Sequence, residues 1–388
     1  MKCLELFAGA GGLAMGIAKT GFEHEAVVEW DKDACDTIRA NQERQHPLVS
    51  EWPLHQDDVR QFDFKGLGKG LDLVAGGPPC QPFSLGGKHQ AFLDARDMFP
   101  QAARAIRELE PKAFIIENVR GLTRPTFSRY FNYIQLQFQY PHLQAKKNEE
   151  WLEHLNRLEK HHTKGRNKDL YYRLVWRVIN AADYGVPQKR ERVVMVGFRS
   201  DLNIEWSFPA PTHSFTALQR DKWVTGNYWE RHEISKKKRP SMPPELKGKL
   251  EALEEQGLWD ERAPWLTIRD AISDLPSPTL KGSAVVLNHV LMPGARTYPG
   301  HTGSPMDLPA KTLKAGAHGV PGGENMLVAD DGSVRYFTVR ESARLQTFPD
   351  DYVFANSWTE AMRQIGNAVP VKMAHVIAQS IGEHLKSA

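Results

Sequence analysis

The first 200 residues repeat one pattern, in which a short apolar run is followed by a stretch with helical spacing of its apolar residues. The pattern predicts strands at 4–7, 26–29, 71–75, 113–116 and 192–198, and helices at about 12–19, 97–109 and 171–182. Strands that alternate with helices form a parallel sheet with helices on both faces. The sequence therefore predicts an α/β fold whose ligands bind at the carboxyl ends of the strands.

Two stretches depart from this pattern. Residues 201–335 are rich in Pro, Gly and Trp, and their loops are long, which is more typical of a binding surface than of filler. We expect a catalytic domain at 1–200, a smaller, irregular domain at 201–335, and a segment at 336–388 that returns to the first domain with helices at 339–346 and from Val371 onward. The charged stretch 146–169 indicates a solvated insertion, although its Lys and Arg residues could also contact phosphates.

Bulk properties exclude several classes of protein. The chain has three cysteines, Cys3, Cys35 and Cys80, without metal-ligand spacing, so neither a zinc site nor a disulfide framework is expected. A reducing, cytoplasmic location fits that cysteine usage. No apolar run reaches about 18 residues, so we expect no membrane helix. The net charge of +3 tolerates a polyanionic partner without arguing for one.

A glycine-rich segment, FAGAGG at 7–12, follows the first expected strand and opens a helix. Glycines there allow a tight turn and a close approach of the backbone to a ligand. Glu29 closes the second strand, where an acidic residue accepts hydrogen bonds from ribose hydroxyls. This pair fits NAD, FAD and S-adenosylmethionine alike, and a tight turn without any ligand is the alternative.

Two further strand ends carry reactive groups. Cys80 lies in GGPPCQPFS, where the flanking prolines prevent regular structure and favour a nucleophile in a loop over a buried structural thiol. Cys3 and Cys35 fall on strand and helix positions and are interpreted as structural. Glu117 ends the apolar run of FIIENV, so its pKa should be raised by desolvation, as suits a general acid. The alternative for Glu117 is a cap of the next helix.

Taken in order along the chain, these segments resemble one family, the cytosine-5 DNA methyltransferases. The resemblance covers about 1–120, 170–200 and 335–388, and its most specific part is PPCQPFS together with ENV. The matching segments are FAGAGG, EWD at 29–31, GGPPCQPFS at 76–84, ENV at 117–119, VPQKRERVVMVGF at 186–198, RESARLQTFPDDY at 340–352 and QIGNAVPV at 364–371. The resemblance implies a Rossmann-like, S-adenosylmethionine-dependent methyltransferase sheet, with a target-recognition domain at 201–335.

The resemblance also implies roles for single residues. Trp30 would lie against the adenine of the cofactor and Asp58 on its amino group, although Asp57 directly precedes Asp58. The whole expected cofactor pocket is Phe7, Ala8, Gly9, Gly11, Gly12, Glu29, Trp30, Asp58, Pro78, Asn367 and Val369. Cys80 would be the nucleophile, Glu117 the acid at ring nitrogen 3, and Arg190 and Arg192 would hold the cytosine carbonyl and the surroundings of the thiolate. Thr312 would support the backbone of an extruded nucleotide.

The implied reaction needs these groups. A thiolate that adds to carbon 6 of cytosine makes carbon 5 electron-rich, and a hydrogen bond at nitrogen 3 stabilises the charge that develops. Arg190 and Arg192 alternate on the expected strand and so share one face, unless they are merely surface arginines. Because carbon 6 is inaccessible in stacked DNA, the base must be flipped out. The segment 84–98 is expected to close over it, with Ser84, Lys88 and Arg96 at the DNA.

Alternatives and partners remain open at this point. A tRNA cytosine-5 methyltransferase shares much of the motif set, but usually has a smaller recognition domain and Thr where this chain has Ser84. An oxidoreductase that binds a nucleotide, or a catalytically silent DNA-binding relative, would leave some of these motifs unused. We expect double-stranded DNA as substrate, S-adenosylmethionine as cofactor with S-adenosylhomocysteine as product, no metal, and a monomer. A separate restriction endonuclease is an expected companion, by analogy alone.

Overall fold

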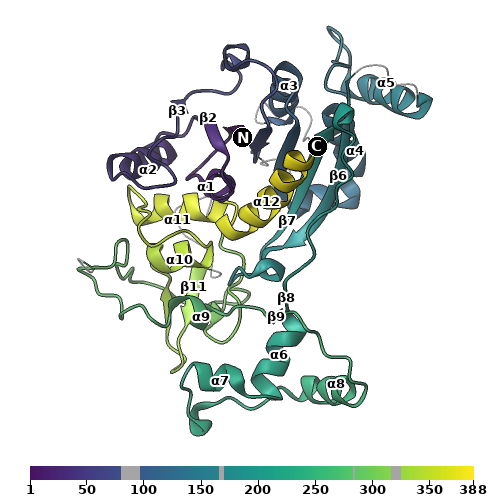
Figure 1. Cartoon of the computed structure of the whole chain (residues 1–388). Coiled ribbons are helices and arrows are strands. Elements are labelled where there is room, and N and C mark those ends of the chain that lie inside the picture. The colour runs from purple at the N-terminus through teal and green to yellow at the C-terminus, as the bar shows by residue number, and fades with distance from the viewer. Residues whose placement is uncertain (80–96, 166–169, 283–284, 316–324) are drawn as a thin grey trace.

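The computed structural model describes residues 1–79, 97–165, 170–282, 285–315 and 325–388. At its centre is a seven-stranded sheet in the order β3-β2-β1-β4-β5-β7-β6 (Figure 1). Its strands are β1 (Lys2–Leu6), β2 (Glu23–Glu29), β3 (Leu54–Gln56), β4 (Leu73–Gly76), β5 (Ala113–Val119), β6 (Tyr172–Asn180) and β7 (Glu191–Arg199). The short strands elsewhere are β8 (His213–Ser214), β9 (Ala263–Pro264), β10 (Ser304–Pro305), β11 (Met326–Val328) and β12 (Val334–Tyr336).

Helices connect and cover these strands. In the first 200 residues they are α1 (Gly12–Ala18), α2 (Lys32–Glu43), α3 (Phe99–Leu109), α4 (Ser128–Gln139) and α5 (Trp151–Lys164). The later ones are α6 (Phe215–Trp223), α7 (Asn227–Arg231), α8 (Pro244–Glu255), α9 (Ile268–Ile272), α10 (Val339–Leu345), α11 (Trp358–Asn367) and α12 (Val371–Ser387). The predicted α/β fold is confirmed, as are the helices expected at 339–346 and from Val371.

The sheet is mixed, so the prediction of a parallel sheet is confirmed for β1 to β5 and is wrong for β7. Strands β1 to β5 run parallel, but β7 pairs antiparallel with both β5 and β6. The buried apolar run of β7 reads the same in either direction, which is why strand direction could not be inferred from it. As a consequence, the start of β7 lies at the same edge of the sheet as the ends of β1, β2, β4 and β5.

The helix predicted at about 171–182 was also wrong, because this segment forms the edge strand β6. Tyr172, Leu174 and Val178 pack on the side of the sheet that carries α4, and the Trp176 ring contacts Phe131 of that helix. Those positions alternate with a period of two, which is the period of a strand. Pairing with β7 along its whole length satisfies the backbone of β6 on one side.

The core lies on both faces of the sheet. One face is covered by α3 and α4, whose apolar residues pack against Leu4, Leu6 and Phe114. The other face is covered by α12, which packs against α1 and against Leu73 and Ile115 (Figure 1). The last helix of the chain is therefore part of the fold that the first strand begins.

The two irregular stretches differ in how they meet this core. Helix α5 buries His154, Leu155 and Leu158, and the His154 ring bonds to Tyr133 of α4, so the expected solvated insertion is in part a docked helix. Helices α6 and α7 share a small cluster around Leu218, Tyr228 and Trp229, away from the sheet (Figure 1). Among the described residues, none of the helices has the length and apolarity that crossing a bilayer requires.

Candidate active site

Functional side chains gather where the central strands of the sheet end. Glu29 is the last residue of β2, and Glu117 lies near the end of β5. Arg192 lies near the start of β7, where it pairs in register with Val119 of β5. The direction reversal at β7 thus places a basic strand start beside an acidic strand end, which sequence spacing alone did not predict.

The turn from β1 to α1 has an unusual backbone. Phe7, Gly9 and Gly11 have φ of 56°, 54° and 79°, in the left-handed region that favours glycine. A Cβ at Gly9 would meet nothing within 4 Å, while one at Gly12 would lie 2.4 Å from the carbonyl oxygen of Val369. Gly9 therefore faces open space that a ligand can use, and Gly12 is required for packing against the segment before α12.

Glu29 organises this turn. Its carboxylate accepts hydrogen bonds from the backbone N–H of Gly9 at 2.7 Å, of Trp30 at 2.9 Å and of Asp31 at 2.8 Å. Burial raises the pKa of Glu29, and these bonds act against that rise. Trp30, next to it, leaves 69% of its surface exposed. An exposed indole beside a buried carboxylate offers a stacking surface for a base and a hydrogen-bond acceptor for hydroxyl groups, both of which a nucleoside can use.

Asp58 follows β3 and is held in a different way. The N–H of Asp57 donates to the carbonyl of Glu29 at 3.0 Å, which keeps this segment beside the end of β2. The Asp58 carboxylate accepts two bonds from Nε of Arg60, at 2.9 and 3.0 Å, and a further bond from its Nη2. These bonds lower the pKa of Asp58. An amino group of a ligand would compete with Arg60 for this carboxylate.

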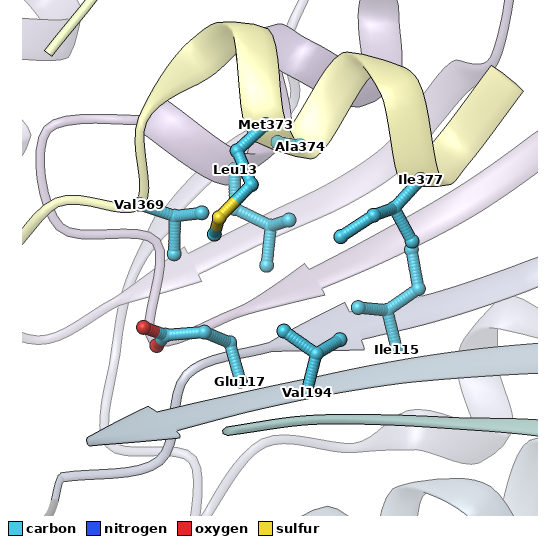
Figure 2. Close-up of a pocket in the computed structure, with 8 residues that line it drawn as sticks. All are labelled: Leu13, Ile115, Glu117, Val194, Val369, Met373, Ala374 and Ile377. Atoms are coloured by element: carbon cyan, nitrogen blue, oxygen red, sulfur yellow. The ribbon is translucent and has the colours of Figure 1, made fainter. Parts of the chain in front are cut away.

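Glu117 is a buried acid with a basic neighbour. Its Oε1 lies 2.8 Å from Nε of Arg192, and both side chains are almost buried. Burial raises the pKa of Glu117, although Arg192 and then Arg190 oppose the rise. Figure 2 shows the cause, since the carboxyl group stands at one side of a small pocket whose other lining side chains are all apolar: Leu13, Ile115, Val194, Val369, Met373, Ala374 and Ile377. The prediction of a desolvated Glu117 with a raised pKa is confirmed.

The segment after β4 runs against Glu117. Nδ2 of Asn118 donates to the carbonyl of Pro78 at 3.0 Å, and a Cβ at Gly77 would lie 3.2 Å from Oε2 of Glu117. The backbone segment that leads to Cys80 is therefore held against Glu117. Cys80 itself, and the expected DNA-contacting residues Ser84, Lys88 and Arg96, lie outside the described residues.

Arg190 and Thr312 belong to two segments that are far apart in the sequence and in contact in the structure. Arg190 is fully buried, and its guanidinium donates to the carbonyls of Leu313, Gly366 and Ala368. The Thr312 hydroxyl donates to the carbonyl of Lys189 at 2.7 Å. Arg192 thus faces Glu117 directly, whereas Arg190 is engaged by backbone carbonyls. Arg190 precedes β7, which begins at Glu191, so the expected i, i+2 alternation of the two arginines along one strand did not predict the separate partners that each has.

The end of the chain completes the glycine turn, through the expected Asn367 and Val369 and through Tyr352, which the sequence analysis did not single out. Asn367 is exposed at the end of α11, and Val369 lies beside Gly12. The hydroxyl of buried Tyr352 donates to the carbonyl of Ala10 at 2.8 Å, in the middle of the glycine turn. Its only sequence signal was its position at the end of the RESARLQTFPDDY segment.

Cys3 and Cys35 are buried in β1 and α2, as the structural interpretation predicted. Across the described ranges, we find no group of three or more His, Cys, Asp or Glu side chains that could hold a metal ion.

Comparison with known proteins gives a consistent result over the whole chain. A family model described as C-5 cytosine-specific DNA methylase matches residues 1–140 and 146–383. The chain is 33% identical to the Type II methyltransferase M.PspPI of Psychrobacter sp. (strain TA137), over 99% of this chain and 80% of that protein. It is 31% identical to the Type II methyltransferase M.NgoMIV of Neisseria gonorrhoeae, over 99% of this chain and 97% of that protein.

Among solved structures, the fold is similar to that of the S. pombe Dnmt2 methyltransferase. The TM-score is 0.56 at 16% sequence identity, and the match covers 99% of both chains. At that identity the similarity concerns the fold alone, and it extends through both the sheet and the residues beyond 200.

Proposed function

Because the chain belongs to the C-5 cytosine-specific DNA methylase family, we propose that it methylates carbon 5 of a flipped cytosine in duplex DNA through a covalent adduct on Cys80. The tRNA alternative is not favoured, since the family model and the relatives matched over nearly the whole chain are DNA methylases and Type II methyltransferases. The observation that carries the mechanism is the buried Glu117–Arg192 pair at the strand end where the segment leading to Cys80 arrives.

The chemistry assigned to these residues follows from their surroundings. The Cys80 thiolate forms a bond to carbon 6, and the electron density that this pushes into the ring is stabilised at nitrogen 3 by Glu117. Burial favours the protonated form of Glu117, which can donate the required hydrogen bond. Arg192, at 2.8 Å from Glu117, orients that carboxyl group and adds positive charge next to the ring. Once carbon 5 carries the methyl group that bound S-adenosylmethionine would supply, loss of the carbon-5 proton to a base and departure of the Cys80 thiolate from carbon 6 would restore the ring.

The cofactor site is assigned to the turn between β1 and α1. S-adenosylmethionine supplies an electrophilic methyl group when bound. Its fit rests on the open space at Gly9, the exposed Trp30 ring and the buried Glu29 acceptor. The remaining residues assigned to this pocket are Phe7, Ala8, Gly11, Gly12, Asp58, Pro78, Asn367 and Val369. Asp58 must exchange its bonds with Arg60 for a bond to the adenine amino group.

The domain and partner assignments belong to the same proposal. We assign target recognition to 201–335, the catalytic domain to 1–200, and its completion to 336–388. Thr312 is placed at the backbone of the flipped nucleotide, with Ser84, Lys88 and Arg96 at the DNA. The relatives named above are Type II methyltransferases, which supports a role beside a separate restriction endonuclease in a bacterial cytoplasm. We propose that the chain acts as a monomer and uses no metal.

A covalent trap tests the proposal. Bisulfite sequencing of DNA from cells that express the protein first identifies the methylated site. A duplex with 5-fluorocytosine at that site, incubated with protein and S-adenosylmethionine, should then give a denaturant-resistant complex, because the fluorine blocks the final elimination.

The matched variants are Cys80→Ser, which should give no complex, and Cys35→Ser, which should still give one. The Cys35 thiol lies 3.4 Å from the carbonyl of Glu29, a bond that a serine hydroxyl can keep. Wild-type protein that methylates DNA without ever being trapped would disprove the Cys80 adduct, and methylation of tRNA in place of the duplex would restore the alternative.

A further inference from the structure

The tripeptide Gln188–Arg190 lies between three parts of the chain. The carbonyl oxygen of the Gln188 side chain accepts the N–H of Leu313 at 3.0 Å, and its amide group donates to the carbonyl of Leu345 at 3.2 Å. The Lys189 N–H donates to the carbonyl of Ala310 at 2.8 Å. Each residue of the tripeptide thus binds the 310–315 segment or the C-terminal part of the chain.

Arg190 makes the contact that joins those two parts directly. Its Nη1 donates to the Leu313 carbonyl at 3.1 Å, while its Nη2 donates to the carbonyls of Gly366 at 2.7 Å and Ala368 at 2.9 Å. The side chain is 0% exposed. The Nη1 and Nη2 donors are used in this way, while the buried Nε has no partner among the described residues. Because each further unsatisfied donor on a buried guanidinium costs free energy, loss of any of the three carbonyls is unfavourable.

The two bridged segments are also in van der Waals contact. A Cβ at Gly366 would lie 2.5 Å from the backbone nitrogen of Ala315, so the 313–315 backbone rests directly on the end of α11. The next residues along α11 and beyond are Asn367 and Val369, which the proposed function assigns to the cofactor. On the opposite segment, Leu313 lies two residues before Ala315. It is preceded by Thr312, which the proposed function assigns to the DNA.

We propose that Arg190 is a positioning residue that couples the cofactor-side segment 364–369 to the DNA-side segment 310–315, so that occupation of one site orders the other. This rests on the proposed function for the identity of the two ligands. It gives Arg190 a role distinct from that of Arg192, which faces Glu117. A lysine could reach one of the three carbonyls but cannot supply the planar fork that holds Leu313 and the α11 end at once.

Amide hydrogen exchange with S-adenosylhomocysteine, in the absence of DNA, tests the coupling. In the wild type the product should slow exchange in 364–369 and also in 310–315, by about fivefold or more, the lower end of typical couplings. In Arg190→Met the protection of 364–369 should remain, and that of 310–315 should disappear. Arg190→Lys is the variant less prone to misfolding, and it should retain part of the protection of 310–315.

Arg199→Met is the matched control. Arg199 lies at the other end of β7 and donates to the carbonyl of Glu110 at 2.7 Å, so its loss also removes a guanidinium–carbonyl bond but leaves the bridge intact. It should lower the melting temperature without changing the protection of 310–315, which separates coupling from general destabilisation. Wild-type protein in which only 364–369 is protected would overturn the coupling, whereas protection at neither segment would count against the cofactor assignment.

Discussion

At the level of single residues, Glu117 shows how a carboxyl group becomes a usable acid. Burial raises its pKa, so a larger protonated fraction persists toward neutral pH than for an ordinary glutamate. Glu117→Gln should lower kcat by about 100- to 10,000-fold, the usual contribution of a positioned acid. It should leave the affinity for S-adenosylhomocysteine nearly unchanged, because the carboxyl group acts on the base.

The pH dependence of the rate gives a second measurement of the same residue. If protonated Glu117 is required, kcat of the wild type falls as the pH rises through the raised pKa, and the residual rate of Glu117→Gln should lack that descending limb. Single-turnover rates over a pH series measure both. A glutamine variant that kept the wild-type rate would remove Glu117 from the reaction.

Glu5 is a second buried acid, and its ionisation affects the stability of the fold. It alternates with Leu4 and Leu6 on β1, is 1% exposed, and burial raises its pKa well above the ordinary value. A raised pKa means that stability is fully present below the unfolded-state pKa and is lost as the pH rises toward the folded-state pKa. Glu5→Gln should remove this loss, a difference in slope of about 1.4 kcal/mol per pH unit in that window.

Urea unfolding of wild type and Glu5→Gln at several pH values above 5 measures the two slopes. The free energy of unfolding of Glu5→Gln should increase relative to that of the wild type with each upward step in pH. Parallel stability curves would show that Glu5 titrates alike in the folded and unfolded chain.

At the scale of single residues, the desolvation of Glu117 could be predicted from the sequence, because a carboxylate that follows a run of apolar residues is buried together with them. The sequence could not foresee the partners of Arg190, which come from residues 313, 366 and 368.

At the level of elements, the glycine turn is held by an aromatic residue from far along the chain. The Tyr352 hydroxyl donates to the Ala10 carbonyl. Tyr352→Phe should weaken S-adenosylhomocysteine binding roughly three- to tenfold, since about 1 kcal/mol of support for the turn is lost. Tyr172→Phe is the control, because the buried Tyr172 hydroxyl also donates to a carbonyl, that of Pro111, outside the cofactor turn.

Calorimetric titration and thermal unfolding of the two variants separate affinity from stability. Both should lose about 1 kcal/mol of stability. Equal affinities in the two variants would show that the turn keeps its shape without Tyr352.

The same scale shows where sequence reasoning failed. Strands β1, β2, β4 and β5 were predictable because their apolar runs, bounded by turn residues, are too short for a buried helix, which is the competing interpretation of such a run. In β6 the runs are broken by Arg173 and Arg177, and exposure on an edge strand hides the period of two. The antiparallel position of β7 was equally hidden, yet it is what brings Arg192 to Glu117.

At the level of the whole molecule, the proposed cofactor site is made by the two ends of the chain. Gly12 packs against Val369, and the last helix, α12, packs against α1. A Cβ at Gly382 would lie 3.1 Å from the terminal carbon of Met1, so the start of the chain touches the last turns of α12. The sequence suggested the return of 336–388 to the first domain, but only the resemblance, not the periodicity, connected it to the glycine turn.

This closeness predicts that the chain tolerates circular permutation. From Gly382 to Ala388 the helix advances about 9 Å, so a flexible linker of about eight residues, with a span near 15 Å, can join the ends. New ends can be opened between Gly257 and Leu258, which are exposed after α8. The permutant should bind S-adenosylhomocysteine within about threefold of the wild-type affinity, because the opening leaves the sheet and both halves of the turn intact.

The control is the unpermuted chain with the same linker as a free C-terminal extension, which should bind equally well. Calorimetric titration measures the affinities, and circular dichroism shows whether the permutant is folded. A folded permutant without measurable affinity, beside a control that binds, would mean that the cofactor turn needs a free first strand or last helix. Retained affinity would show that the site depends on how the two ends pack, and that chain order matters only because it delivers them to the same sheet edge.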